Sequence, residues 1–224
     1  MFWCAVAAHA GGITVGNSSF ETPSGCQACY DPGGATWGFT GTAGILGDGN
    51  LEVATPFGAQ TGWLQYLGNA QTPVISQTLT GFTVGDSYVV SFYLAERVSG
   101  AVTLPVIVTM GANNLGEYTP NTTSWTDNVI TSSFVASGTS YTLSFSGDIS
   151  FPGFTPYTIE GDANIDSVAV NDLGVVSSTP EPASFLLAGS ALALVVVRYF
   201  TSRKEQRTRA VSEGYTQTES APTA

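Results

Sequence analysis

Short apolar runs alternate with turn-forming residues over most of this chain. Between about residues 50 and 170 the runs are rich in Val, Ile, Phe, Tyr and Thr, and Gly, Asn, Asp and Pro separate them. No window in this part has a sustained helical period, so the pattern predicts short strands of an all-β fold, a jelly-roll β-sandwich. The predicted strands span 63–67, 74–79, 88–95, 102–110, 128–135, 141–146 and 164–170.

The residues within these runs also predict which positions lie in the core, at a sheet edge or in a turn. The run 88–95 is apolar on both faces, as expected for a central strand. Pro105 favours a sheet edge or a bulge, because proline cannot donate a ladder hydrogen bond. Trp63 alternates in step with its neighbours and, with Tyr93 of the central strand, is predicted to lie in the core. Residues 113–116, Asn-Asn-Leu-Gly, have the chemistry of a turn.

The pattern changes near the C-terminus, where an apolar run at 183–197 precedes a group of cations. Five of the six basic residues of the chain follow this run: Arg198, Arg203, Lys204, Arg207 and Arg209. A short apolar span with cations behind it is typical of a stop-transfer segment whose cations stay in the cytoplasm. We therefore predict a single transmembrane helix at 183–200 and a basic, then polar, disordered tail at 201–224. A buried core helix is the alternative, because the run is short for a bilayer span.

The N-terminus agrees with export. Residues 1–10 are apolar and end in Ala8-His9-Ala10, the small-x-small form of a signal-peptidase site, which predicts a partial signal peptide. An ordinary apolar N-terminus is the alternative. The sandwich domain is then predicted at 11–174 and a linker at 175–182. This organisation predicts a location in the cell envelope, with the sandwich facing outward.

Charge narrows the choice of partners. The net charge is −11, and the predicted domain contains one cation, Arg97, among thirteen acidic residues. Such a surface repels nucleic acid, so we expect no nucleic-acid partner. It suits divalent cations and neutral polymers.

Two cysteines, Cys26 and Cys29, lie in a loop between Pro- and Gly-rich segments. This spacing is also found in redox motifs, but no βαβ pattern surrounds it here. Zinc needs four ligands, and the chain has no His after His9. We therefore predict a local disulfide bond in an oxidising compartment.

Pro180, Glu181 and Pro182 stand directly before the apolar run. The order of this triplet, a short apolar segment and a basic cluster resembles the PEP-CTERM sorting signal of bacteria that make extracellular polymeric substance. The resemblance implies that a membrane enzyme of the exosortase type processes the protein here. One departure is that the family usually ends soon after the basic cluster, whereas this chain continues through residues 210–224.

The predicted domain resembles the galactose-binding-like jelly rolls, a group that includes many carbohydrate-binding modules. The resemblance implies a structural Ca²⁺ held by the glutamate of the opening Phe-Glu motif and an aspartate of the last strand, here Glu21 and Asp166. Asp48 and Glu52 are further candidates from the next segment. The alternative is that these acids are solvated surface groups. The motifs that carry the resemblance are Asn17–Glu21, Gly62–Gln65, Ile75–Leu79 with Gly81, Tyr88–Ala95, Tyr141–Phe145 and Ile165–Val168.

Three aromatic residues are candidates for contact with sugar. Tyr118, Phe154 and Tyr157 are rings that the strand periodicity does not explain, and the last two lie in a stiff loop rich in proline. Exposed rings of this kind stack on pyranose faces. The alternative is that they pack down as a lid on the core.

The sequence lacks the residues that nucleophilic catalysis usually requires. No His follows the predicted signal peptide, and no Gly-x-Ser-x-Gly turn is present. We therefore predict a non-catalytic surface or extracellular-matrix protein that binds exopolysaccharide. Two alternatives stay open: a purely structural surface protein without a ligand, and a glycoside hydrolase that uses two carboxylates.

Overall fold

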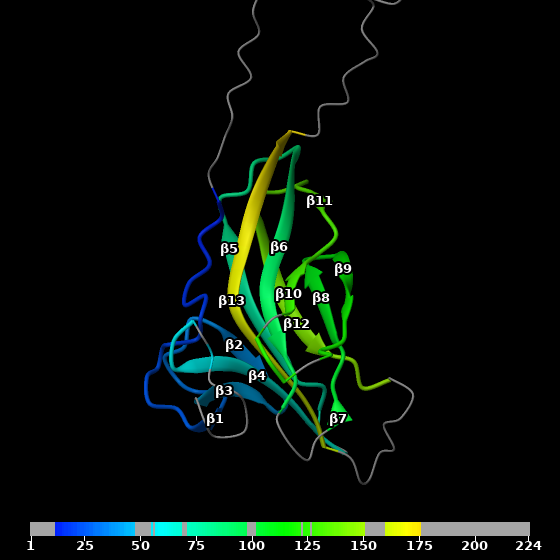
Figure 1. The fold of residues 1–224 in the computed structure, drawn as a ribbon. Helices are drawn as coiled ribbons and strands as arrows, with labels where there is room; N and C mark the ends of the chain where they lie inside the picture. Colours follow the sequence, from blue (N-terminus) through cyan, green and yellow to red (C-terminus); the bar gives the residue numbers. More distant parts are fainter. Residues whose placement is uncertain are drawn as a thin grey trace, which may run out of the picture. The chain divides into compact units, whose positions relative to one another are not determined.

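The structure is a computed structural model, and it describes residues 12–47, 55, 57–68, 71–97, 102–121, 123–125, 127–150 and 160–175. Within these ranges the chain forms thirteen strands and no helix. All of them belong to one unit of the chain, Met1–Val176. The strands form two sheets that face each other, and Figure 1 shows the long strand β13 running the length of one of them.

The larger sheet has the strand order β1-β3-β4-β13-β6-β10, with β11 also paired to β6 and β7 to β13. All pairs are antiparallel except β7 with β13. The C-terminal strand β13 therefore lies in the middle, between β4 and β6. The bounds are β1 Ala28–Tyr30, β3 Ala43–Gly47, β4 Gln60–Leu67, β6 Asp86–Ala95, β7 Val102–Thr103, β10 Asp127–Ile130, β11 Phe134–Val135 and β13 Glu160–Val175.

The smaller sheet has the order β2-β5-β12-β8-β9, and its strands are antiparallel. Several neighbouring strands, such as β4 and β13 or β5 and β12, come from distant parts of the sequence, as is typical of jelly-roll sandwiches. The bounds are β2 Gly38–Thr40, β5 Val74–Thr80, β8 Val106–Met110, β9 Asn113–Tyr118 and β12 Ser140–Gly147.

A continuous apolar core fills the space between the sheets. Alternate residues of most strands point into it, and Phe92 of the larger sheet meets Phe145 of the smaller one with ring centroids 5.0 Å apart. Phe20, from the segment before β1, is fully buried and stacks on Trp37. The predicted all-β sandwich is therefore confirmed.

Two of the local predictions are wrong, and a third is correct only in part. Residues 113–116 are not a turn but part of β9, and the connection between β8 and β9 is only two residues long, Gly111 and Ala112. Trp63 is buried as predicted, with 2% of its surface exposed, but neither Trp63 nor Tyr93 faces the core between the sheets, because the alternating residues Leu64 and Phe92 do. The register of each strand puts these two aromatic rings on the outer face of the larger sheet.

Two predicted strands are interrupted. The run 102–110 divides into β7 and β8 at Pro105, and 128–135 divides into β10 and β11, which both pair with β6. Strand β13 extends to Val175, the first residue of the predicted linker. The strands at 28–30, 38–40 and 43–47 were not predicted from the sequence.

Several predicted features lie outside the described residues. They include the partial signal peptide at 1–10, the sorting triplet at 180–182, the helix at 183–200 and the tail at 201–224. The candidates Asp48, Glu52, Phe154 and Tyr157 lie outside them too. In the part of the chain that the structure describes, no helix is long and apolar enough to cross a membrane.

Candidate functional site

Polar residues occupy the outer face of β13. While Ala163 and Ile165 face the core, Asp162, Asn164 and Asp166 alternate with them on the opposite face, and all three are buried. A buried carboxylate is costly unless a cation or hydrogen-bond donors compensate it. The partners of these residues form two clusters, one at each side of Asn164.

The first is the Arg97 cluster, which consists of Tyr30, Trp63, Gln65, Arg97, Glu160 and Asp162. The Arg97 Nη1 atom donates to Glu160 Oε1 at 2.5 Å and to Asp162 Oδ2 at 2.9 Å. The Trp63 indole Nε1–H donates to Asp162 Oδ1 at 2.8 Å. Burial raises the pKa of Asp162, and the bonds from Arg97 and Trp63 oppose that rise.

Tyr30 covers Trp63 from outside. Their ring centroids are 5.1 Å apart, and 47% of Tyr30 is exposed to solvent. Its hydroxyl donates to Gln65 Oε1, and the Gln65 amide nitrogen donates to Glu160. The cluster thus presents one aromatic ring to solvent, held in place by two hydrogen bonds in series.

The sheet register explains why these two rings meet. Tyr30 pairs with Gly44, and Gly44 pairs with Trp63, so Gly44 lies between the two aromatic residues on neighbouring strands. A Cβ atom at Gly44 would lie 2.0 Å from the carbonyl oxygen of Cys29. Only glycine therefore lets β1 approach β3 this closely, and the absence of a side chain leaves room for the two rings to meet.

The second is the Glu21 cluster, which consists of Glu21, Thr55 and Asp166. Asp166 is fully buried, accepts a hydrogen bond from the Thr55 hydroxyl, and accepts another from the backbone N–H of Ser167 at 2.6 Å. Burial raises the pKa of Asp166 to about 6; bonds from Thr55 and Ser167 lower it, and the charge of Glu21 raises it. The two carboxyl groups that the resemblance pairs therefore interact in the folded protein.

Strained backbone brings these two groups together. Val168 N–H donates to the Ser18 carbonyl at 2.9 Å, which ties the opening segment to β13 where the register with β6 shifts. Phe20 and Ser167, directly beside the two acids, have φ angles of 57° and 51°. Non-glycine residues rarely adopt this conformation, and such strain is concentrated at functional sites.

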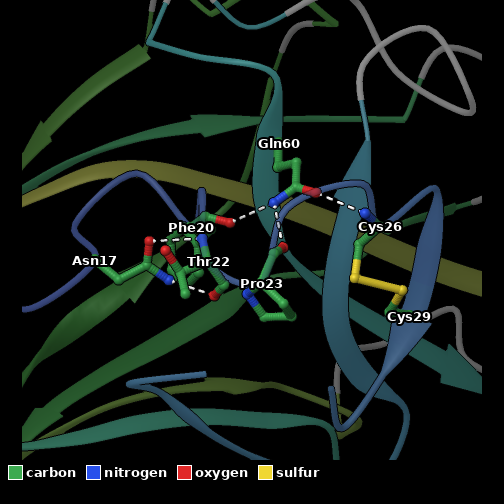
Figure 2. Close-up of a disulfide and its surroundings, with 7 residues drawn as sticks. All are labelled: Asn17, Phe20, Thr22, Pro23, Cys26, Cys29 and Gln60. Atoms are coloured by element: carbon green, nitrogen blue, oxygen red, sulfur yellow. Dashed lines mark hydrogen bonds between the residues drawn. A yellow bond between two sulfur atoms is a disulfide. The ribbon is translucent and has the colours of Figure 1, made fainter. Parts of the chain in front are cut away.

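Gln60 holds the loop that carries Glu21 (Figure 2). Its side-chain amide nitrogen donates to the carbonyls of Phe20 and Pro23, both at 2.9 Å, and its amide oxygen accepts from Cys26 N–H at 2.7 Å. The backbone N–H of Gln60 donates to Glu21 Oε1 at 3.0 Å. One glutamine therefore connects the acidic group to the disulfide loop.

Cys26 and Cys29 form a disulfide bond, the pairing that the sequence predicts (Figure 2). The bond closes the short connection into β1, the strand that carries Tyr30. It therefore lies between the two clusters along the chain and restricts the segment that links them.

The Glu21 cluster fits a hard cation. Two interacting carboxylates, one of them buried, have no cationic partner among the described residues, where the guanidinium of Arg97 is paired with Glu160 and Asp162. Asn164, two positions before Asp166, is fully buried, and neither polar atom of its amide has a hydrogen-bond partner in the structure. Calcium is bound by such carboxylate and amide oxygens together with backbone carbonyls. No group of three or more His, Cys, Asp or Glu lies together in the described part of the chain.

Tyr118 is half-buried at the end of β9. Its ring packs edge-on against Phe92 with centroids 5.9 Å apart, and its hydroxyl donates to the Leu115 carbonyl. The structure thus places it at the margin of the core, and a role in binding sugar stays a prediction.

Sequence reasoning missed Tyr30, Trp63 and Asn164 as site residues. Trp63 was assigned to the core, and the strand that carries Tyr30 was not recognised because only three of its residues pair. One signal was present: Tyr30 directly follows the disulfide loop and precedes Asp31-Pro32, a position that exposes a ring.

No family model and no curated protein matches this chain. Solved structures resemble it at low identity. The enzymatically active domain of tailspike protein 4 from bacteriophage CBA120 is 12% identical with a TM-score of 0.39, and the match covers 62% of this chain and 20% of that one. TmCBM61, solved with β-1,4-galactotriose, is 15% identical with a TM-score of 0.40, covering 70% and 95%.

The CBM22-1 xylan-binding domain of Xyn10C from Paenibacillus barcinonensis is 11% identical with a TM-score of 0.38, covering 61% of this chain and 85% of that one. The chain thus spans most of two carbohydrate-binding modules but only about a fifth of the tailspike domain. Similarities this low assign no ligand, so the proposal below rests on the geometry of the two clusters.

Proposed function

We propose that this protein is an exported, membrane-anchored surface or extracellular-matrix protein without catalytic activity, and that its sandwich binds polysaccharide through the Arg97 cluster. The observation that carries the proposal is the exposed Tyr30 ring, which packs against Trp63 beside the charged groups of Arg97 and Glu160. An aromatic face flanked by a few oriented polar groups is the usual composition of a sugar site.

The chemistry favours a neutral polysaccharide. A pyranose ring stacks its C–H groups on the Tyr30 face, while hydroxyl groups hydrogen-bond to Glu160, whose side chain is about one-third exposed. Arg97 already has two carboxylate partners, so the cluster has a net charge of −1 and does not attract a uronic acid. The net charge of the chain, −11, likewise disfavours binding of an acidic polysaccharide.

Calcium at the Glu21 cluster is a structural part of the proposal. The ion would be held by Glu21 and Asp166, with backbone carbonyls, and would neutralise two carboxylates that otherwise repel each other. Its role is to tie the opening segment to β13, not to take part in chemistry.

The export and membrane anchoring in this proposal rest on features of the sequence. The Pro180–Pro182 triplet, the apolar run 183–197 and the following cations support sorting by a PEP-CTERM-like signal and processing by an enzyme of the exosortase type. The sandwich then faces outward from the cell, with the C-terminal tail in the cytoplasm.

Affinity electrophoresis of residues 11–178 in gels that contain neutral or acidic polysaccharides tests the sugar site. We expect a neutral polysaccharide to retard the protein, and Tyr30→Ala to weaken binding about tenfold or more, because a stacking ring is lost. Tyr30→Phe, which keeps the ring, is the matched control. Unchanged binding of Tyr30→Ala refutes the site, and loss with Tyr118→Ala or Tyr157→Ala moves it to those rings. No binding to any polysaccharide favours the purely structural alternative.

The hydrolase alternative is tested with the same polysaccharides. Glu160 and Asp162 both accept a hydrogen bond from the same nitrogen of Arg97, so their carboxylates lie close together. Glycosidases also use two neighbouring carboxylates. The Asp162 side chain is only 1% exposed, however, and both of its oxygens accept hydrogen bonds. We therefore expect no release of reducing sugar. Release that Glu160→Gln abolishes would establish a hydrolase instead.

A further inference from the structure

One end of the sandwich carries exposed apolar side chains. Val84, Val135, Leu173 and Val175 are 53–62% exposed, and among the large hydrophobic residues that the structure describes only Ile130 is more exposed. They lie at one level of the larger sheet, because Val135 pairs with Ser87, Val175 pairs with Asp86, and Val84 is in the turn just before β6. We call these four residues the apolar end.

This end has little charge although the protein is strongly acidic. Among the described residues only two acids, Asp86 and Asp172, pair at this level, and Asp86 is buried. The adjoining turns, 81–85 and 136–139, consist of Gly, Ala, Ser, Thr, Phe and Val. Burying this surface against a partner therefore desolvates few charges.

The same end is where the chain leaves the sandwich. Strand β13 ends at Val175, and only seven residues, 176–182, separate it from the apolar run 183–197. Seven residues span at most about 25 Å when fully extended. If the run lies in a bilayer, the apolar end is held close to the surface of that bilayer.

We propose that the apolar end contacts the surface of the membrane that anchors the chain. The inference rests on the anchor described under Proposed function. Apolar side chains gain free energy when they leave water for the interfacial region of a bilayer. The low charge of this end avoids repulsion by anionic lipid headgroups, which the acidic remainder of the sandwich would suffer. A second copy of the chain is the other occupant that such a surface would suit.

Membrane contact at this end determines where the sugar site points. Arg97 and its partner Glu160 lie at the opposite end of β13, and sixteen residues of strand span about 50 Å. The Arg97 cluster is then directed away from the cell, toward extracellular polymer.

Fluorescence quenching of the full chain in phosphatidylcholine vesicles tests the contact. Single cysteines are introduced as Val84→Cys or Leu173→Cys in a Cys4→Ser background and labelled with an environment-sensitive dye without reductant, so that the Cys26–Cys29 disulfide stays closed. Leu67→Cys is the matched control, because Leu67 is exposed and pairs with Glu160 at the opposite end of β13. We expect nitroxide-labelled lipids to quench the dye at Val84 and Leu173 several-fold more than at Leu67.

Flotation of the same vesicles separates failure of the inference from failure of the anchor. A chain that floats with the vesicles but is quenched equally at all three positions keeps the anchor and overturns the contact. A dye at Val84 or Leu173 that is shielded from water but not quenched by lipid indicates a second copy of the chain, which also overturns it. A chain that does not float overturns both.

Discussion

The carboxyl group of Asp166 is fully buried, so the stability of the fold depends on whether this group is ionised. Its pKa rises from 3.8 to about 6, chiefly because burial disfavours the ionised form, and the charge of Glu21 adds to this effect. Near neutral pH, the ionised Asp166 therefore destabilises the fold unless a cation compensates it. Glu21 lies in a loop that Gln60 holds beside β13, so the repulsion is built into the structure.

The stability of the metal-free protein should fall as pH rises. Because Asp166 holds its proton more tightly when folded than when unfolded, stability is highest below pH 4 and decreases by about 3 kcal/mol as pH rises through 6. Urea unfolding in chelator measures this, and added calcium should reverse the loss at pH 7. Asp166→Asn should remove both the calcium response and most of the pH dependence. Burial also raises the pKa of Asp162, so that carboxyl group contributes to the pH dependence in the same direction.

The exposed Asp31 serves as the control for this prediction, because Asp31→Asn changes one carboxylate outside both clusters. It should leave the pH and calcium responses intact. A melting temperature of the unmutated protein that calcium does not change at pH 7 would rule out the ion at Glu21 and Asp166.

The segment from Asn17 to Cys26 has no regular secondary structure, and side chains of neighbouring elements satisfy its backbone. Gln60 of β4 bonds three of its polar groups, and the Asn17 side chain bonds both the N–H and the carbonyl of Thr22 (Figure 2). Buried backbone groups must find partners of this kind when no strand pairs with them. The element that carries Glu21 is therefore ordered by single glutamine and asparagine side chains.

Gln60→Leu should destabilise the protein by about 3 kcal/mol or more. The substitution keeps the side-chain size but leaves the carbonyls of Phe20 and Pro23 and the N–H of Cys26 without their partner. Urea unfolding of the calcium-free sandwich measures the change. Gln71→Leu, at an exposed position, should cost less than about 0.5 kcal/mol. Equal stability of the two variants would show that Gln60 does not hold the loop.

At the scale of the whole molecule, β13 links the Arg97 cluster to the apolar end. The strand begins at Glu160 and ends at Val175, and β4 and β6 flank it. It also carries Asp166 between these two points. One strand therefore determines the relative positions of the proposed sugar site, the proposed calcium site and the start of the anchor segment.

The anchor has its own test in cells. With the protein produced behind a signal peptide in a bacterial host, we expect it in the membrane fraction, and deletion of residues 183–200 should release it. Protease added to intact spheroplasts should degrade the sandwich but spare an epitope after Ala224, because the cations at 198–209 keep that tail inside. Loss of the epitope together with the sandwich would refute this orientation.

Part of the architecture could be predicted from local pattern. The strands at 74–80, 86–95 and 140–147 are long, apolar and bounded by turn residues, and their predicted positions agree with the structure within two residues. Residues 113–116 were wrongly predicted as a turn because Asn and Gly are typical of turns, whereas pairing with β8 holds these residues in a strand. The face on which Trp63 lies was wrongly predicted, because alternation identifies the two faces of a strand but not which of them meets the core.

The sequence by itself determined the class of fold, the acidic character and the order of domain, triplet, apolar run and cations, since these depend on composition and short-range pattern. Only the tertiary structure decided which distant residues meet. Tyr30 reaches Trp63 across Gly44, and Glu21 reaches Asp166 because the opening segment bonds to β13. Such contacts join residues up to 145 positions apart, and they depend on strand register and order, which nonlocal pairing decides.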